Sequence, residues 1–163
     1  MGNVTDASKN GVLEKCLSVL AKGYTTGFFD ELFPLLAEDC MFETQWRMEP
    51  EAGKAAVIAY FTAKGQTLRD SACCPEADLI QFVGDANPIR NADMLFNGEP
   101  HHGTFVMMYE PNKLALRLRQ RLNGQENRVI ADLTLNEQDQ IRRIDLCMPE
   151  LFRYRVLQTM INK

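Results

Sequence analysis

Few side chains in this chain of 163 residues could transfer protons or bind a metal ion. His101 and His102 are the two histidines, and histidine titrates near neutral pH. Because they are adjacent in a polar stretch, their rings cannot easily reach one metal ion, and no Cys or carboxylate cluster with ligand spacing lies nearby in the sequence. We therefore expect no metal site, and we keep His101 and His102 as candidates for proton transfer from a surface loop.

The cysteines are odd in number, widely spread and without a paired C-x-x-C spacing. They are Cys16, Cys40, Cys73, Cys74 and Cys147. This pattern indicates reduced thiols rather than a disulfide framework or a zinc site. The vicinal pair Cys73 and Cys74, just before Pro75, could have a redox or metal-binding role, although a loop or a helix end is the simpler interpretation.

Arginines are frequent in the last third of the chain, where acidic residues lie among them. The set comprises Arg117, Arg119, Arg121, Arg128, Arg142 and Arg143, with Glu126, Asp132 and Asp145. Alternating charges on adjacent strands indicate either a cross-strand ladder or a self-complementary dimer face. Arg142 differs, because its parity in a strand matches Ile144 and Leu146. We interpret it as an inward anchor for an acidic ligand or as a side chain that reaches solvent at the end of the sheet.

The length and the 45% hydrophobic content are those of a single domain with its own core, which we expect over residues 1–163. The formal charge of −4 and the pI near 5.2 lack the basic excess that neutralises several phosphates, so nucleic acid is not an expected partner. The first residues contain no basic-then-apolar signal, and no apolar run approaches the roughly 18 residues of a membrane span. We expect a cytoplasmic protein with no membrane partner.

Apolar residues at three- and four-residue steps predict three helices near the start of the chain. Residues 11–20 have such a stripe, and residues 29–36 have another beyond a break at Gly27, although Pro34 interrupts it. A third stripe covers about residues 53–64 and ends at Gly65. A short C-terminal helix is expected over about residues 149–161.

A two-residue period after the second helix predicts a strand with one face inward. The inward set is Cys40, Phe42, Thr44 and Trp46. Residues 77–84 and 104–110 are also strand-like, with the second expected to resume the sheet. The polar stretch 85–103 between them is rich in Asn, Pro and Gly and is expected to form a loop over one end.

The Asn-Gly dipeptide at residues 123–124 predicts a two-residue hairpin turn, because both residues tolerate positive φ. One register places the leucines on one face and the charged residues on the other. Its pairs are Leu122–Gln125, Arg121–Glu126, Leu118–Val129, Leu116–Ala131 and Leu114–Leu133. A second turn at residues 136–139 returns a strand in which Ile144 and Leu146 join the apolar face and Arg143 lies near Asp132.

The stretch LFPLLAEDCMFETQW followed by GKAAVIAYF, within residues 13–65, resembles the nuclear transport factor 2-like superfamily, which includes ketosteroid isomerase and the SnoaL-like polyketide cyclases. The late strands agree, so the resemblance covers about residues 11–148. It implies an α+β, cone-shaped, cystatin-like fold, with three N-terminal helices on the concave face of a curved, mostly antiparallel sheet. It also implies an apolar pocket inside the cone.

Isomerases of this group use a carboxylate base and an oxyanion site made by a tyrosine and a protonated aspartic acid. By the resemblance, these positions are Thr44 for the base, Cys16 for the tyrosine and Ala131 for the acid. None of the three can do that chemistry near neutral pH. Asp132 is one place along and faces the other side of its strand, unless a β-bulge turns it or Glu43 inward. We therefore do not expect steroid isomerisation by that mechanism.

The resemblance also predicts which residues line the pocket. They are Cys16, Phe42, Thr44, Trp46, Tyr60, Leu116, Leu118, Val129, Ala131 and Leu146. Trp46 is the preferred ligand contact, because an indole at a strand end can stack on a planar ligand and stay partly wet. Plain core packing is the alternative for the aromatic members of this set.

Three functions remain open. The first is a homodimeric protein that binds a small apolar or aromatic molecule without a cofactor. The second is a cofactor-free cyclase, isomerase or dehydratase in which Asp132, His101 or His102 transfers the proton. The third is a protein-interaction module that uses the charged sheet face while the interior is only core.

Overall fold

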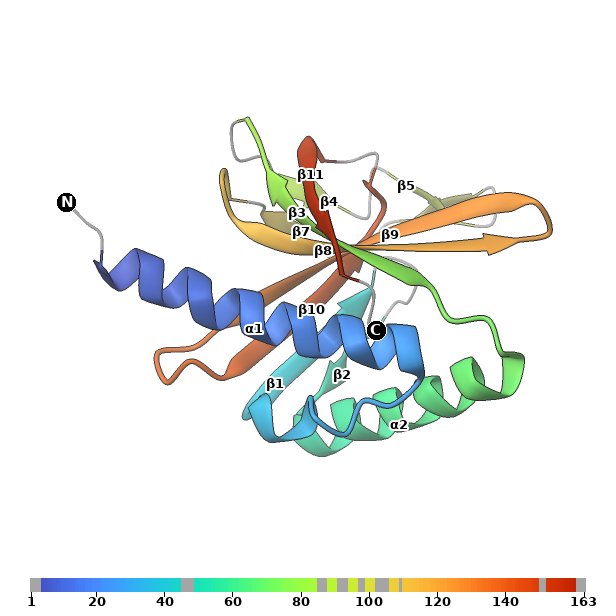
Figure 1. Ribbon diagram of the computed structural model, residues 1–163, viewed down its shortest axis with the longest axis horizontal. Coiled ribbons are helices and arrows are strands. Elements are labelled where there is room, and N and C mark those ends of the chain that lie inside the picture. The colour runs from blue at the N-terminus through green and yellow to red at the C-terminus, as the bar shows by residue number, and fades with distance from the viewer. Residues whose placement is uncertain are drawn as a thin grey trace.

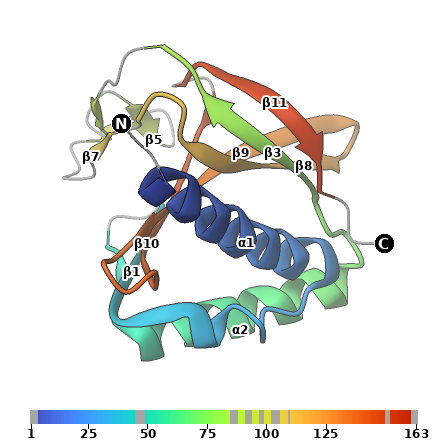
Figure 2. The same ribbon diagram turned by 60° about the vertical axis from the view of Figure 1, so that its left-hand side comes forward.

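The computed structural model describes residues 4–44, 49–84, 88–90, 94–96, 99–101, 106–108, 110–149 and 152–160. Its main element is a curved seven-stranded sheet in the order β11-β3-β8-β9-β10-β1-β2 (Figure 1). The two α-helices of the described chain, α1 and α2, both lie on the concave side of this sheet (Figure 2). The α+β class and the curved sheet were predicted, but three N-terminal helices were not found.

α1 is one helix, Val4–Thr26, where the first of two short helices was predicted. It continues N-terminally beyond the predicted start and ends at Gly27, which has a φ of 82°. The Gly27 N–H donates to the Gly23 carbonyl at 2.7 Å, which closes the last turn.

The second predicted helix, at residues 29–36, is wrong. The chain makes a turn and one short 3-10 helix, η1, Phe33–Leu35, and then enters the sheet. Pro34 lies at the start of η1 and has no N–H to continue an α-helical ladder. Two residues of the apolar stripe, Phe29 and Leu32, are nevertheless buried in the main core.

α2 spans Lys54–Ser71 and passes through Gly65, where the sequence predicted its end. At Gly65 the helix crosses the chain just beyond α1: a Cβ there would lie 2.5 Å from the Gly27 carbonyl oxygen. Arg69, one turn later, donates a hydrogen bond to the same oxygen. Gly65 is therefore a close-packing position rather than a helix stop.

The strands of the main sheet are antiparallel to their neighbours except for the parallel pair β1 and β10. Their bounds are β1 Leu36–Thr44, β2 Glu51–Ala52, β3 Glu76–Phe82, β8 Leu114–Leu122, β9 Gln125–Leu135, β10 Ile141–Cys147 and β11 Tyr154–Thr159. β1 therefore starts four residues earlier than the predicted strand, and its last predicted member, Trp46, lies outside the described residues.

The β8–β9 hairpin has the predicted register. The confirmed pairs are Leu122–Gln125, Arg121–Glu126, Leu118–Val129 and Leu116–Ala131. Asn123 and Gly124 have φ values of 52° and 79°, as the predicted turn requires. The ladder begins at Leu116, so the fifth predicted pair, Leu114 with Leu133, is not part of it.

In β10 a register shift between residues 141 and 143 alters the prediction. Arg143 lies opposite Thr134 rather than near Asp132, and it is Asp145 that lies opposite Asp132. Arg142 is exposed, so the structure places it at the solvent rather than as an inward anchor. A bulge interrupts the alternation of side chains between the two faces of a strand. The face of Arg142 could therefore not be predicted by counting back from Ile144.

The predicted C-terminal helix is wrong, because residues 154–159 form the edge strand β11. β11 pairs antiparallel with β3, from Tyr154 opposite Phe82 to Thr159 opposite Asp78. The β3 edge offers unpaired backbone groups, and this pairing outweighs a weak helical pattern in a segment that also contains aromatic and β-branched residues.

The segment predicted as a polar loop contains short ladders in its described parts. β4, Pro88–Arg90, pairs with β7, Val106–Met108, and β5, Met94–Phe96, pairs with β6, Glu99–His101. β7 was expected to resume the main sheet but pairs only with β4 in the described chain. The remaining residues of this segment lie outside the described part.

Apolar side chains are buried on both faces of the sheet. The larger core lies between the sheet and the helices, and a smaller core lies on the outer face. The outer core consists of Ile80, Phe82, Ala115, Ile130, Cys147 and Phe152, with Tyr154 packed against it. Neither described helix has the combination of length and apolarity needed to cross a bilayer.

Candidate ligand-binding cavity

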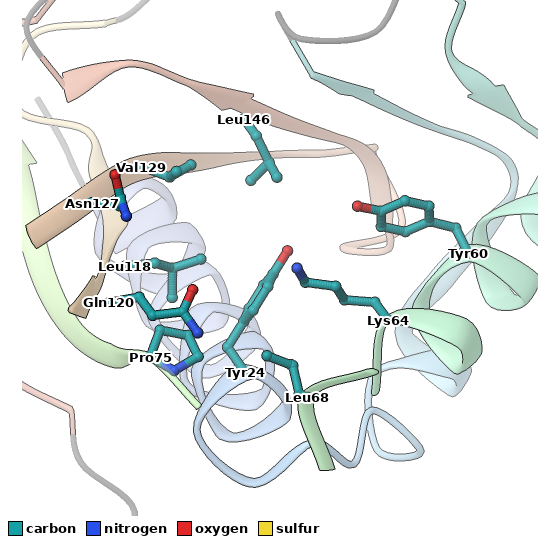
Figure 3. Close-up of a pocket in the computed structure, with 10 residues that line it drawn as sticks. All are labelled: Tyr24, Tyr60, Lys64, Leu68, Pro75, Leu118, Gln120, Asn127, Val129 and Leu146. Atoms are coloured by element: carbon teal, nitrogen blue, oxygen red, sulfur yellow. The ribbon is translucent and has the colours of Figure 1, made fainter. Parts of the chain in front are cut away.

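A cavity of about 120 Å³ lies between α1, α2 and the concave face of the sheet (Figure 3). Both helices, three strands and the segment before β3 contribute to its wall. The lining residues are Tyr24, Tyr60, Lys64, Leu68, Pro75, Leu118, Gln120, Asn127, Val129 and Leu146. Four of them, Tyr60, Leu118, Val129 and Leu146, belong to the pocket predicted from the sequence.

Tyr24 is the contribution of α1. It continues the stripe of Leu13, Leu17 and Leu20, so its ring points toward the sheet and is only 3% exposed. Phe29 and Phe61 hold that ring edge-on, with centroids 5.1 and 6.3 Å away. The position of the ring is thus fixed by packing.

The Tyr24 hydroxyl is buried and has no hydrogen-bond partner in the described part of the chain. In Figure 3 it points into the cavity. Burial raises the pKa of Tyr24 far above its ordinary value, and the neighbouring Tyr60 adds to the effect. The hydroxyl therefore stays protonated at neutral pH, where it can donate a hydrogen bond but cannot act as a base.

α2 presents Tyr60, Lys64 and Leu68 at successive four-residue steps, which places the three on one helix face. The Tyr60 ring packs on Phe42 with centroids 4.3 Å apart and on Phe61 at 5.1 Å. Lys64 is partly buried, and its ammonium end points into the cavity (Figure 3). Lys64 is the one charged residue among the ten that line the described cavity.

The sheet contributes apolar side chains from its three central strands and amides from the hairpin. Leu118, Val129 and Leu146 form the apolar wall. Gln120 and Asn127 lie opposite each other across the β8–β9 ladder. The Gln120 side-chain amide donates to the Cys73 carbonyl, so one of its two polar ends is already used to hold the segment before β3.

The other predicted pocket residues are placed differently. Cys16, Phe42, Leu116 and Ala131 are buried in the main core without lining the cavity, and Thr44 is 7% exposed but also does not line it. Burial raises the pKa of Cys16, so its thiol stays neutral. Trp46 lies outside the described residues.

The two carboxylates that a β-bulge could have turned inward do not line the cavity. Glu43 accepts a hydrogen bond from Arg143 at 2.7 Å. Asp132 is 2% exposed and also absent from the lining, so the wall in the described chain has no carboxylate.

Asp132 instead belongs to a charged group in which Asp132 and Asp145 are buried and Lys113 and Arg143 are partly buried. Lys113 Nζ lies 3.0 Å from Asp132 Oδ1 and donates a hydrogen bond to Oδ2 at 3.3 Å. Burial raises the pKa of Asp132 to about 6, against the lowering effect of Lys113. Burial also raises the pKa of Asp145, although Arg143 donates to Asp145 Oδ1 at 3.0 Å and opposes this shift.

The remaining candidates do not form a centre in the described chain. The backbone of His101 lies in β6, opposite Met94, while His102 lies outside the described residues. No group of three or more His, Cys, Asp or Glu there could hold a metal ion. The five cysteines are free, and Cys73 and Cys74 lie partly exposed between α2 and β3.

The arginines of the late strands pair mostly within the chain. Arg117 and Arg119 both donate to Asp78, at 2.6 and 2.7 Å, and Arg119 also contacts Glu76. Arg128 contacts Glu126 at 3.6 Å. Of the two interpretations, the cross-strand ladder is the one that these contacts support.

Six of the ten lining residues were not predicted from the sequence, although the spacing of most of them matches that of residues that were predicted. Tyr24 follows Leu20 by one helical turn, and Lys64 follows Tyr60 by four residues. Gln120 and Asn127 have the same parity as Leu118 and Val129 in the predicted hairpin. Only Pro75, in a connection between elements, had no periodicity to place it.

No protein-family model matches the chain, and no characterised protein matches it by sequence. Among solved structures, an NTF2-like protein from Anabaena variabilis is 17% identical, with a TM-score of 0.49 over 90% of this chain and 92% of that one. A candidate polyketide cyclase from Sinorhizobium meliloti is 12% identical, with a TM-score of 0.48 over 84% of this chain and 97% of that one.

A protein with a cystatin-like fold from Silicibacter pomeroyi is 16% identical, with a TM-score of 0.46 over 86% of this chain and 73% of that one. The three structures share 12% to 17% identity with this chain, with TM-scores of 0.46 to 0.49. Because the identities and scores are low, they carry no inference about activity. The fold and site define the class: an α+β protein with a helix-covered cavity on the concave face of a curved sheet.

Proposed function

We propose that this protein binds a small molecule in the cavity between α1, α2 and the sheet. The observation that carries the proposal is the Tyr24 hydroxyl, which is buried, aimed into the cavity and without a hydrogen-bond partner in the described chain. Leaving such a group unsatisfied costs about 1–3 kcal/mol. A ligand with an acceptor atom at this point would offset that cost.

The cavity volume limits the ligand to about one ring. At about 120 Å³ it is smaller than the roughly 150 Å³ of an engineered protein cavity that binds benzene, and well below the roughly 300–1,000 Å³ of most sites for larger small molecules. A four-ringed steroid would extend well beyond this volume. The volume therefore favours single-ring ligands within the apolar or aromatic class expected from the sequence.

The test is a binding screen with single-ring compounds, followed by ligand-observed NMR on the protein and two variants. Leu118→Phe fills the cavity from the sheet side and should abolish binding while the chain still folds. Val156→Phe adds a similar ring at an exposed position on β11 and should leave binding unchanged. Equal binding by the protein and Leu118→Phe would reject the cavity as the site.

Proton-transfer catalysis without a cofactor is a second candidate, and Asp132 is the observation that favours it. This carboxyl is buried beside Lys113, and its pKa of about 6 suits exchange of a proton near neutral pH. Because Asp132 does not line the cavity, a substrate would have to bind elsewhere. Any isomerase, cyclase or dehydratase activity should then fall by about 100-fold or more in Asp132→Asn.

A homodimer is a separate proposal. Val156 and Leu157, 46% and 44% exposed on the edge strand β11, supply apolar surface that a second copy could cover. Light scattering across a concentration series measures the mass directly, and a mass of one chain at all concentrations would contradict this proposal.

A further inference from the structure

The cavity has an asymmetric distribution of charge and of hydrogen-bond donors. Its one formal charge in the described chain is the Lys64 ammonium, and no carboxylate lines it to balance that charge. The Tyr24 hydroxyl, on the other helix, remains protonated and has its donor free in the described chain. The opposite wall, from Leu118, Val129 and Leu146, is apolar.

We infer that the ligand is a single-ring carboxylate, with its anionic oxygens between Tyr24 Oη and Lys64 Nζ and its ring against Leu118, Val129 and Leu146. This inference rests on the proposed function and adds the chemical class of the ligand. It uses two observations together, since the orphan hydroxyl favours an acceptor and the partly buried ammonium, with no carboxylate among the lining residues, favours a negative charge.

A neutral acceptor would satisfy only half of this arrangement. A ketone or an amide could accept the Tyr24 hydrogen bond, but its ring would also cover Lys64 and remove water from the ammonium without providing a counter-charge. A carboxylate accepts from both groups, and hydrogen bonds that involve a charged partner are shorter and about twice as strong as neutral ones.

The arrangement also defines the direction of pH dependence. Burial keeps the Tyr24 hydroxyl protonated well above neutral pH, so the donor does not limit binding there. The ligand carboxyl is the titrating group, and carboxyl groups of this kind have pKa values of about 4 in water. Binding should therefore hold above about pH 5 and weaken as the pH falls below 4.

The experiment compares benzoate, benzamide and toluene, three probes of similar ring size, by calorimetry and ligand-observed NMR at pH 7. Benzoate should bind at least about tenfold more tightly than benzamide. Tyr24→Phe and Lys64→Met should each weaken benzoate by about tenfold or more while changing toluene by less than about twofold.

Lys22→Met is the matched control, because it removes the same charge from an exposed lysine of α1 that contacts Glu31 and does not line the cavity. It should leave benzoate binding unchanged. Circular dichroism and thermal unfolding check that each variant is folded before its affinity is compared.

The outcomes separate the two proposals. If toluene or benzamide binds as tightly as benzoate, or if Lys64→Met and Lys22→Met behave alike, the carboxylate inference is overturned while ligand binding in the cavity stands. If none of the three probes binds the folded protein at millimolar concentration, both proposals are overturned.

Discussion

Replacing Asp132 by Asn should stabilise the folded protein at neutral pH and have little effect in acid. Asp132 is 2% exposed, and its pKa is raised from 3.8 to about 6, chiefly because burial disfavours the charged form. The folded state therefore holds the proton more tightly than the unfolded state. The stability that this group contributes is present in acid and is lost as the pH rises from about 4 through 6.

The size of the effect follows from the same shift. A difference of about two pKa units corresponds to about 3 kcal/mol of unfolding free energy. Between pH 4 and pH 7.5, the unfolding free energy of the unsubstituted protein should fall by about 2 kcal/mol because Asp132 ionises. The unfolding free energy of Asp132→Asn should not show this decrease. The variant also loses the contact with Lys113, whose side chain is 15% exposed and can turn toward water, so the net gain at pH 7.5 is about 1–2 kcal/mol.

Urea unfolding followed by circular dichroism at several pH values between 4 and 7.5 measures this directly. Asp30→Asn is the control, because Asp30 is exposed and the substitution should leave the pH dependence of stability as it is. The reasoning is refuted if the stability difference between Asp132→Asn and the protein does not grow with pH, or if the variant is the less stable of the two at pH 7.5.

Three further predictions concern the stability of the fold. Tyr24→Phe should leave the unfolding free energy unchanged or raise it by up to about 1 kcal/mol, because the lost hydroxyl has no hydrogen-bond partner in the described chain. Urea unfolding measures this, and a loss above about 1 kcal/mol would contradict it. Gly65→Ala should lower the unfolding free energy by about 1–3 kcal/mol, because its Cβ would meet the Gly27 carbonyl. Gly11→Ala, which adds a Cβ in open space on α1, should raise the unfolding free energy by up to about 1 kcal/mol. Thermal unfolding measures both, and equal effects at the two sites would refute the close-contact argument. Asp78→Asn should cost about 3 kcal/mol at pH 7, because burial raises the pKa of this carboxyl but Arg117 and Arg119 outweigh burial and lower it, and the cost should shrink in acid. A cost independent of pH would exclude the ion pairs as its cause.

The hairpin was the most predictable element, because two independent signals agreed there. The Asn-Gly turn fixed the loop length, and the leucine parity fixed the register, so pairs such as Leu118–Val129 could be predicted. Local sequence was enough because the two strands are consecutive.

Elements that depend on distant partners were predicted less well. β11 is a strand because β3 offers an open edge, which the local pattern of residues 154–159 does not reveal. α2 continues through Gly65 because the chain beyond α1 needs room there, and a glycine that permits close packing looks the same in a sequence as a glycine that ends a helix.

The cavity was predicted in location but only in part in composition. The resemblance directed attention to positions such as Cys16, which is core, while Tyr24 carries the free donor one helical turn beyond the stripe considered. Whether a core position faces a void depends on how the helices and the sheet are spaced, and close contacts such as that of Gly65 with Gly27, which brings α2 against the end of α1, cannot be read from periodicity.

The place of β10 in the sheet has a consequence for how the chain is assembled during synthesis. β10 joins β9 to β1, so it connects the part of the sheet formed by the later strands to the β1–β2 end against which α2 packs. Its pairing with β1 links residues as far apart as Leu36 and Ile141. Closure of so distant a pair is slow, and it cannot begin until β10, Ile141–Cys147, has left the ribosome. A nascent chain that stops before β10 would leave one edge of β1 without its neighbouring strand, and an open edge of this kind can pair with other chains.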